Sequence, residues 1–584
     1  MEKIDPSLNL ALWLAENNMV QNESLQYGYD AEKKLWTVIV KHIGEIRYIE
    51  DAFPGTRVVE LFNQYAIITT SAQNLLLIAE LPEIEFMEKP KKLYFNLDRG
   101  RGASCINTVQ QGNGFSGQKS GLTGQGVLIG IIDSGIDLLH PAFLDDEGNT
   151  RIAYLWDQSM LSEEAGGQTP ERYGFGKEYS STELNQIIQS LTNTQMPGED
   201  RSSGHGTSVA GVAAGNGNGS VGRRYRGVAT ESELIVVKLF RREDDFAGTT
   251  QVMEGLDYVI RKAIALQKPI AVNLSFGNNS GAHDGRSLFE NYISELNGVW
   301  KNVIVVASGN EGDARHHASV MLESGSEEVP FAIGANETAM TLQIWKQYVD
   351  DVSIQIVSPS GETVSVVREE GEAVSYKIGN DRLFVFYGAP TPYTIAQEIY
   401  IEWIPQTAGG TVTSGVWSIV FTADDVQDGR IDLWLPTIEA VGLSTGFLRA
   451  DPDTTLTIPA TAFLIVTVGA YRVDTESVSS FSGRGNTADG RAMPTLLAPG
   501  VGVITTVPGG GYSPRTGTSI AAPFVTGSAA LMMEWGIVQE NDPYLYGEKI
   551  KAYLMKGARK FTNQTQVPSQ AEGYGALCLG NSFP

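Results

Sequence analysis

The sequence predicts an α/β protein in which a parallel sheet carries flanking helices, with a small α+β domain before it and an all-β domain inserted into it. Apolar runs alternate with Gly-rich turns and helical segments from residue 126 onward, as buried parallel strands with crossover helices do. Short alternating strands replace this pattern between residues 320 and 454, after which the α/β pattern resumes. With 584 residues, the chain has room for about four units of roughly 150 residues each.

The composition is that of a folded protein with an acidic surface. Hydrophobic residues make up 42% of the chain and charged residues 19%, which excludes a largely disordered chain. The net charge of -25 argues against nucleic acid and against anionic membrane surfaces as partners. The sequence contains no uncharged run of about 18 apolar residues, as a membrane-spanning helix would need. Asn9 and Glu16 interrupt the N-terminal apolar stretch, which is not typical of a signal peptide. We therefore expect an intracellular protein with no nucleic-acid partner and no membrane partner.

The chain has two cysteines, Cys105 and Cys578, which lie far apart in the sequence. In an intracellular protein we expect them to be reduced thiols rather than a disulfide. The six histidines form no HExxH pattern and the cysteines form no CxxC pair, so the spacing of a metal site is missing. We therefore expect neither a metal ion nor another cofactor.

The N-terminal region divides into two parts. Residues 1–34 have the pattern of a short polar-flanked helix and a linker, and we expect them to form an N-terminal extension. Residues 35–96 contain an alternating strand, a helix that ends at Pro82 and a returning strand, which predicts a compact β-α-β unit. Because a unit of about sixty residues buries little core, we expect it to need a partner surface for stability.

The remaining elements follow from their apolar patterns. Runs predicted to form buried parallel strands cover residues 126–135, 231–240, 268–277, 302–310 and 462–471. Segments predicted to form helices cover residues 206–215, 249–267 and 519–535. The insert, residues 320–454, has short alternating strands separated by turn signals, which predicts an all-β sandwich or jelly roll.

Three reactive side chains stand where small residues let a substrate approach. Asp133 follows a predicted buried strand, His205 lies between two glycines ahead of a helix, and Ser519 opens a helix rich in Ala and Gly. Taken singly, each has a structural interpretation as a cap or a turn residue. Taken together, they supply a hydroxyl nucleophile, a base for its proton and a carboxylate that orients the base. We therefore interpret Asp133, His205 and Ser519 as a catalytic triad.

The segments GIIDSGID, GHGTSVAG, VNLSFG, VASGNEG and GTSIAAPFVTG resemble the signature blocks of the subtilisin-like serine protease family. The resemblance covers about residues 126–318 and 455–579. An α/β-hydrolase would need glycine two residues after the serine, where this chain has Ala521. The resemblance implies a subtilisin-like parallel sheet with flanking helices. Its catalytic domain is split over residues 97–319 and 455–584, with the jelly-roll insert between the two parts.

The resemblance also implies roles for residues around the triad. Asn310 would point its amide at the developing oxyanion together with the backbone N–H of Ser519. Substrate would bind in extended form between two walls of the cleft. The residues of these walls are Ser275, Phe276 and Gly277 on one side and Ala307, Ser308 and Gly309 on the other. None of these wall positions holds an acidic residue that would demand a basic substrate side chain.

In this family a small N-terminal prodomain assists folding and then inhibits by leaving its tail in the cleft. Residues 35–96 fit this role, and we expect self-cleavage near Lys92–Asp98, with the prodomain retained in the cleft. The insert and the absence of a signal peptide are similar to the Csp germination proteases of clostridia. This similarity implies limited proteolysis of a protein or peptide substrate, the proform of a cortex-lytic hydrolase, and a spore-associated location. The alternative is a regulatory protein that cleaves only itself and whose cleft stays plugged by its prodomain.

Overall fold

The computed structural model contains two compact units, Met1–Tyr94 and Phe95–Pro584. Of the segment Lys92–Asp98, where self-cleavage is expected, only the backbone from Asn96 onward is described. The residues that the structure describes are 3, 4, 8, 12, 29–30, 33–61, 64–88, 96–111, 121–160, 166–190, 196–200, 203–239, 248–370, 373–406 and 410–583.

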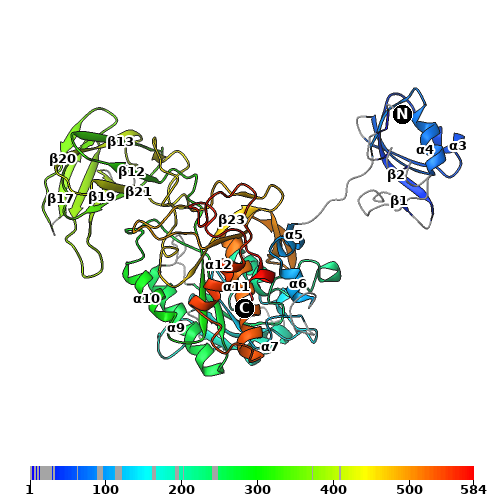
Figure 1. The fold of residues 1–584 in the computed structure, drawn as a ribbon, viewed down its shortest axis with the longest axis horizontal. Helices are drawn as coiled ribbons and strands as arrows, with labels where there is room; N and C mark the ends of the chain where they lie inside the picture. The colour runs from blue at the N-terminus through cyan, green and yellow to red at the C-terminus, as the bar shows by residue number, and fades with distance from the viewer. Residues whose placement is uncertain are drawn as a thin grey trace. The chain divides into compact units, whose positions relative to one another are not determined.

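In the described residues, the N-terminal unit is an antiparallel sheet with two short helices (Figure 1). Its strand order is β1-β2-β4-β3, and β5 pairs with β2. Alternation along β2 buries Trp36, Val38 and Val40 in the core of this unit. Ile4 and Leu8, from the region expected to be an extension, belong to the same core. The elements are β1 (Tyr29–Asp30), β2 (Leu35–His42), α3 (Ile49–Ala52), β3 (Arg57–Leu61), β4 (Tyr65–Thr70), α4 (Ala72–Ala79) and β5 (Ile84–Glu88).

The second unit is built on a mostly parallel sheet, which has nine strands among the described residues. Its order is β24-β23-β11-β10-β6-β9-β7-β8, and β25 pairs with β23. All five runs predicted to be buried strands lie in this sheet, as β6, β9, β10, β11 and β23. The strands are β6 (Leu128–Asp133), β7 (Ile152–Asp157), β8 (Lys177–Ser180), β9 (Glu233–Lys238), β10 (Ile270–Leu274), β11 (Asn302–Ala307), β23 (Val466–Arg472), β24 (Ser477–Val478) and β25 (Leu496–Pro499). A hairpin of β26 (Val503–Val507) and β27 (Gly511–Arg515) follows.

Both faces of this sheet are buried, which explains why its central strands are continuous apolar runs. In β6, Ile129 and Ile131 pack in the core that contains α8 and α11, whereas Leu128 and Ile132 pack in the core that contains α9 and α10. Figure 1 shows α9 and α10 side by side. The helices are α5 (Asn96–Ala103), α6 (Ile106–Gln110), α7 (Ser181–Ser190), α8 (His205–Ala214), α9 (Thr249–Leu266), α10 (Leu288–Leu296), α11 (Thr518–Met533) and α12 (Glu548–Gly557). Short helical segments are η2 (Pro141–Phe143), η4 (Val221–Arg223), η5 (Glu534–Val538) and η6 (Leu579–Asn581).

Helix α11 is the central helix of this unit and is apolar on all sides. Together with η5 it forms a segment, Thr518–Val538, that is long and apolar enough to cross a bilayer. However, 89% of its most apolar window is buried inside the protein. A helix that is hydrophobic all round is expected in the core of a large domain, and α11 contacts β10, β11 and β23 there.

The prediction of two reduced thiols is wrong in this structure, because Cys105 and Cys578 form a disulfide. The prediction relied on the expected intracellular location and on the large separation of the two cysteines, which are 473 positions apart in the sequence. The C-terminal segment returns to the start of α6, where the Leu579 N–H donates to the Ser104 carbonyl at 2.9 Å. This contact brings the two Cα atoms to within 4.8 Å.

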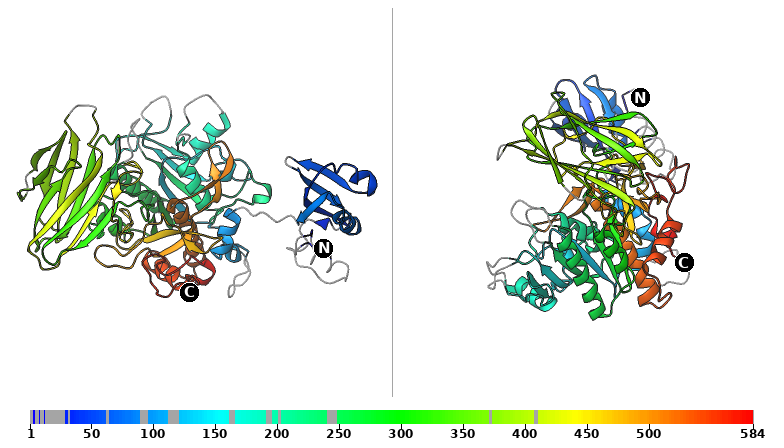
Figure 2. Two further views of the ribbon diagram at one scale, coloured as in Figure 1. Left: turned by 90° about the horizontal axis from the view of Figure 1, so that it is seen from above. Right: turned by 90° about the vertical axis from the view of Figure 1, so that its left-hand side faces the viewer.

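The insert folds into two antiparallel sheets that share one apolar core. One sheet has the order β12-β21-β14-β19-β18-β17 and the other β16-β15-β20-β13-β22. Figures 1 and 2 show the insert as a lobe at one end of the second unit. Its strands are β12 (His317–Met321), β13 (Ser326–Ile333), β14 (Met340–Gln347), β15 (Asp351–Val357), β16 (Thr363–Ser365), β17 (Ala373–Ile378), β18 (Asp381–Tyr387), β19 (Ala396–Pro405), β20 (Gly415–Asp425), β21 (Arg430–Trp434) and β22 (Gly446–Phe447).

Candidate active site

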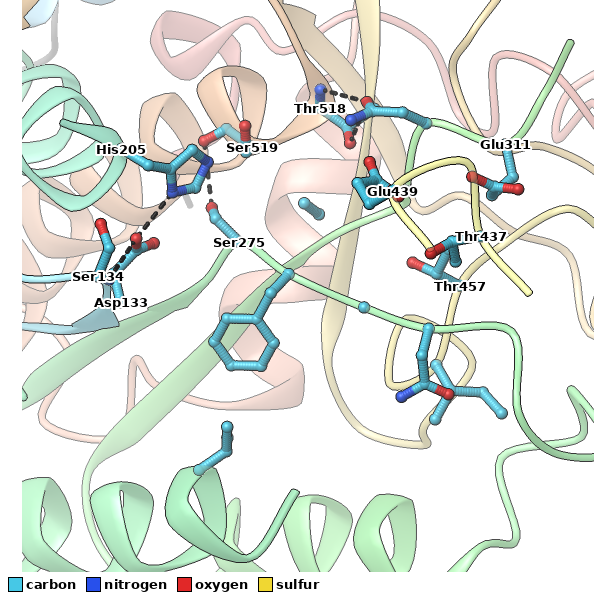
Figure 3. A pocket seen from close by; sticks show the side chains of 18 of the residues that line it. Asp133, Ser134, His205, Ser275, Glu311, Thr437, Glu439, Thr457, Thr518 and Ser519 are labelled. Atoms are coloured by element: carbon cyan, nitrogen blue, oxygen red, sulfur yellow. Dashed lines mark hydrogen bonds and ion pairs between the residues drawn. The ribbon is translucent and has the colours of Figure 1, made fainter. Parts of the chain in front are cut away.

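The fold brings the three predicted triad residues to one cavity of about 570 Å³. Asp133 is the last residue of β6, His205 is the first residue of α8, and Ser519 is the second residue of α11. The carboxyl end of a strand in an α/β sheet is where ligands usually bind. Figure 3 shows the imidazole of His205 with Asp133 on one side and Ser519 on the other.

Asp133 and His205 form a hydrogen-bonded pair. His205 Nδ1 lies 2.7 Å from Asp133 Oδ1, and since an ionised carboxylate can only accept, Nδ1 carries the proton. This tautomer leaves Nε2 with a lone pair, as a general base requires. The Asp133 side chain is 5% exposed and that of His205 is 35% exposed, so the carboxylate is shielded while the base remains open to the cavity.

A second carboxylate, Asp200, fixes the segments that carry this pair. Its Oδ1 accepts from the Ser134 hydroxyl at 2.7 Å, and its Oδ2 accepts from the Thr207 N–H at 2.9 Å and hydroxyl at 2.8 Å. The Gly206 N–H donates to the Ser134 hydroxyl at 2.9 Å. Burial raises the pKa of Asp200, whereas the hydrogen bonds from Thr207 and Ser134 oppose this shift. Asp200 was not predicted, because it lies outside the signature blocks.

Glycine at position 206 permits the close approach of α8 to β6. A Cβ atom at Gly206 would lie 2.2 Å from the Gly135 carbonyl oxygen and 3.1 Å from Asp133 Cβ. The residue before His205, Gly204, has a left-handed conformation with φ of 67° at the helix N-cap. The Gly-His-Gly sequence is therefore needed to place the imidazole beside the carboxylate.

The residues predicted to bind an oxyanion also lie together. Asn310 Oδ1 accepts from the Thr518 N–H and hydroxyl, both at 3.1 Å, so its NH₂ group is turned away from Thr518. Ser519 belongs to the first turn of α11, where backbone N–H groups have no acceptor within the helix. A Cβ atom at Gly517 would lie 3.0 Å from Ser519 Oγ and 3.9 Å from Asn310 Nδ2. Glycine therefore keeps open a space that both polar atoms border, where a developing oxyanion can be stabilised.

The residues predicted to form the substrate walls lie at the carboxyl ends of β10 and β11. The segments that follow β10 and β11 both line the cavity. Five of the six predicted wall residues do so: Ser275, Phe276, Gly277, Ala307 and Gly309. Ser308 instead is fully buried, and its N–H donates to the Val468 carbonyl at 2.9 Å. The side chain of Ser308 therefore lies behind the wall.

Several cavity residues were not predicted. Thr437, Glu439 and Ala440 follow β21 of the insert and line the same cavity as Ser519. Thr457, from the segment that returns to the parallel sheet, lines it as well. These residues lie far from the signature blocks in sequence, so the sequence held no local signal for their position.

Among the described residues, no group of three His, Cys, Asp or Glu side chains gathers at a spacing that would hold a metal ion. The absence of a metal or other cofactor stays a prediction. The cavity contains a hydroxyl, an imidazole paired with a carboxylate, and two N–H donors. These groups can support acyl transfer through a serine nucleophile.

The fold and this site define the class of serine hydrolases with an Asp, His, Ser order. The chain belongs to the subtilase family, whose sequence model matches residues 124–386 and 440–575. A second model, the Csp protease B prodomain, matches residues 2–91. The match to this prodomain thus includes both the expected extension and the α+β unit.

A solved structure, the Clostridium perfringens CspB protease, is 35% identical to this chain with a TM-score of 0.74. The likeness covers 83% of this chain and 96% of that one. The C5a peptidase of Streptococcus pyogenes is 23% identical over 72% of this chain and 36% of its own length. The minor extracellular protease Vpr of Bacillus subtilis is 22% identical over 79% of this chain and 52% of its own length. The chain therefore spans about a third to a half of these two curated relatives.

Proposed function

We propose that this protein is a serine endopeptidase that cleaves off its own prodomain and then activates a protein substrate by limited proteolysis. The observation that carries the proposal is the Asp133–His205 pair in one cavity with Ser519 and Asn310. Membership of the subtilase family supports peptide-bond hydrolysis as the reaction.

The proposed reaction follows from the positions of these groups. Ser519 Oγ attacks the scissile carbonyl carbon while His205 Nε2 accepts the hydroxyl proton. Asp133 stabilises the imidazolium, and the Asn310 amide and the Ser519 N–H stabilise the oxyanion. His205 then donates its proton to the leaving amine, and water hydrolyses the acyl-enzyme with His205 again acting as the base.

The N-terminal unit is proposed to be the prodomain, and its tail, Lys92–Asp98, the site of self-cleavage. The match of residues 2–91 to the Csp protease B prodomain supports this role. Intact-mass analysis of the purified chain tests it, with Ser519→Ala as the inactive control. We expect two fragments from the active chain and a single full-length mass from Ser519→Ala. Identical processing of both proteins would exclude self-cleavage.

The proposed substrate is the proform of a cortex-lytic hydrolase, and the proposed location is intracellular or spore-associated. The resemblance to the Csp germination proteases supports both proposals, as does the likeness to the Clostridium perfringens CspB protease. The insert is proposed to be a jelly roll, on the basis of its two antiparallel sheets around one core. Incubation of the candidate proform with the wild-type chain and with Ser519→Ala tests the substrate, since only the wild-type chain should shorten it.

The match to a prodomain also favours a second function, a regulatory protein whose cleft stays plugged after self-cleavage. The two functions differ in what happens after the N-terminal unit has been cleaved. A plugged protein remains unreactive toward a small fluorophosphonate probe, whereas an active endopeptidase is labelled on Ser519. Labelling of the fully processed protein would therefore exclude the plugged state.

A further inference from the structure

A loop of the insert forms part of the wall of the catalytic cavity. This loop, residues 435–442, follows β21, and its residues Thr437, Glu439 and Ala440 border the same space as His205 and Ser519. Figure 3 shows Glu439 on the Thr518 side of the cavity, with Thr437 and Thr457 nearby. The insert is thus a component of the cavity itself.

Buried hydrogen bonds fix this loop next to the oxyanion segment. Glu311, the residue after Asn310, is 2% exposed, and its Oε1 accepts from the Ile438 N–H at 3.0 Å. Its Oε2 accepts from His316 Nδ1 at 2.6 Å and from Asn279 Nδ2 at 3.3 Å. The same Asn279 amide donates to the Leu435 carbonyl at 3.1 Å. The loop therefore keeps a defined position relative to the reacting groups.

Thr457 also borders the cavity, and its buried hydroxyl lies close to both glycine walls. A Cβ atom at Gly277 would lie 2.3 Å from Thr457 Oγ1, and one at Gly309 would lie 2.5 Å from it. The hydroxyl therefore lies between the two predicted substrate walls. Thr457 is 3% exposed, and within the described part of the chain its Oγ1 has no hydrogen-bond partner. A buried hydroxyl without a partner is costly, so a substrate group that bonds to it gains affinity.

The charge of the cavity has one sign. The acidic residues that line it are Asp133, Glu311 and Glu439, and no lysine or arginine is among the residues that border it in the described part of the chain. The first two are committed to internal hydrogen bonds with histidines, whereas the Glu439 side chain is exposed. Glu439 is therefore the carboxylate available to a substrate.

We propose that Glu439 and Thr457 form a specificity subsite that the insert adds to the protease. The subsite takes a substrate side chain with an N–H donor, a cation or a carboxamide, and disfavours a carboxylate. Glu439 accepts from the donor, and a side chain that reaches the buried Thr457 Oγ1 from the cavity also bonds to this hydroxyl. This proposal rests on the proposed endopeptidase function and names its side-chain preference.

The test uses the full chain and quenched fluorescent peptides that differ only at the residue before the scissile bond, which is Lys, Gln, Leu or Glu. We expect wild-type kcat/KM to be highest for Lys and Gln and lowest for Glu. Glu439→Gln should reduce the ratio of kcat/KM for the Lys peptide to kcat/KM for the Glu peptide about tenfold. This effect is smaller than that expected for a fully buried charged hydrogen bond, because Glu439 is exposed to water. Thr457→Val should lower hydrolysis of the Gln peptide more than that of the Leu peptide.

Glu323→Gln is the matched control, because Glu323 is an exposed acid of the insert that does not border the cavity. It should leave every kcat/KM ratio unchanged. Equal hydrolysis of the Lys and Glu peptides by the wild-type chain, or equal ratios in wild type and Glu439→Gln, overturns the subsite. Labelling of Ser519 by fluorophosphonate without hydrolysis of any peptide overturns it as well. Absence of labelling contradicts the proposed function itself, which separates the two failures.

Discussion

Replacement of Gly206 by alanine should uncouple His205 from Asp133 without unfolding the protein. The added methyl group would lie 2.2 Å from the Gly135 carbonyl oxygen, whereas a carbon and an oxygen atom ordinarily stay at least about 3.3 Å apart. The start of α8 and the end of β6 must therefore separate by about 1 Å. Since a displacement of about 1 Å can reduce catalysis about 10²-fold, we expect a loss of that size in Ser519 reactivity.

The assay is the second-order rate constant for fluorophosphonate labelling of Ser519, measured beside thermal unfolding. Gly298→Ala is the control, because the new methyl group would have its nearest neighbour, the Glu295 carbonyl oxygen, at 3.7 Å. We expect wild-type reactivity from Gly298→Ala and about 10²-fold lower reactivity from Gly206→Ala. If folded Gly206→Ala reacted at the wild-type rate, the tight contact between α8 and β6 would not govern the triad geometry.

Three further predictions concern the oxyanion site, acid stability and the disulfide. Asn310→Ala should lower kcat by about 10² to 10³, the loss found for the equivalent donor in a subtilisin, and peptide kinetics should show little change in KM. Burial lowers the pKa of His283 to about 4, so the unfolded chain binds a proton below about pH 6.5 that the folded protein excludes. The free energy of unfolding should therefore fall by about 3 kcal/mol between pH 6.5 and pH 4. Urea unfolding of His283→Gln should show a smaller fall over this pH range, and a fall equal to that of the wild type would contradict the prediction. Under non-reducing conditions, Cys105→Ser should lower the thermal unfolding midpoint to that of the reduced wild-type protein. If calorimetry finds no difference between the oxidised and the reduced wild-type protein, the disulfide does not stabilise the fold.

The sequence was sufficient to predict those elements that a local pattern of residues defines. The continuous apolar runs predict β6 and β10 because a strand buried on both faces needs no polar residues. Asp133, His205 and Ser519 could be selected as a candidate triad because each stands in a short block that contains glycine, and at Gly206 the glycine has a steric reason beside Asp133.

Other features depend on contacts between distant segments. The disulfide of Cys105 with Cys578 follows from the return of the C-terminus to α6, which no local pattern encodes. Glu439 reaches the cavity because Glu311 binds its loop, and neither residue signals this in sequence. Ser308 was assigned to a substrate wall, but in the fold its side chain is buried behind that wall.

The proposed function requires that Ser519 is a nucleophile activated by His205 and Asp133. Its most direct measurement is the labelling of the full chain by a fluorophosphonate, with the modified residue located by peptide mass analysis and with His205→Ala as the comparison. We expect labelling on Ser519 in the wild-type chain and a loss of at least about 10²-fold in His205→Ala. Equal labelling of both folded proteins, or labelling at another residue, would contradict it.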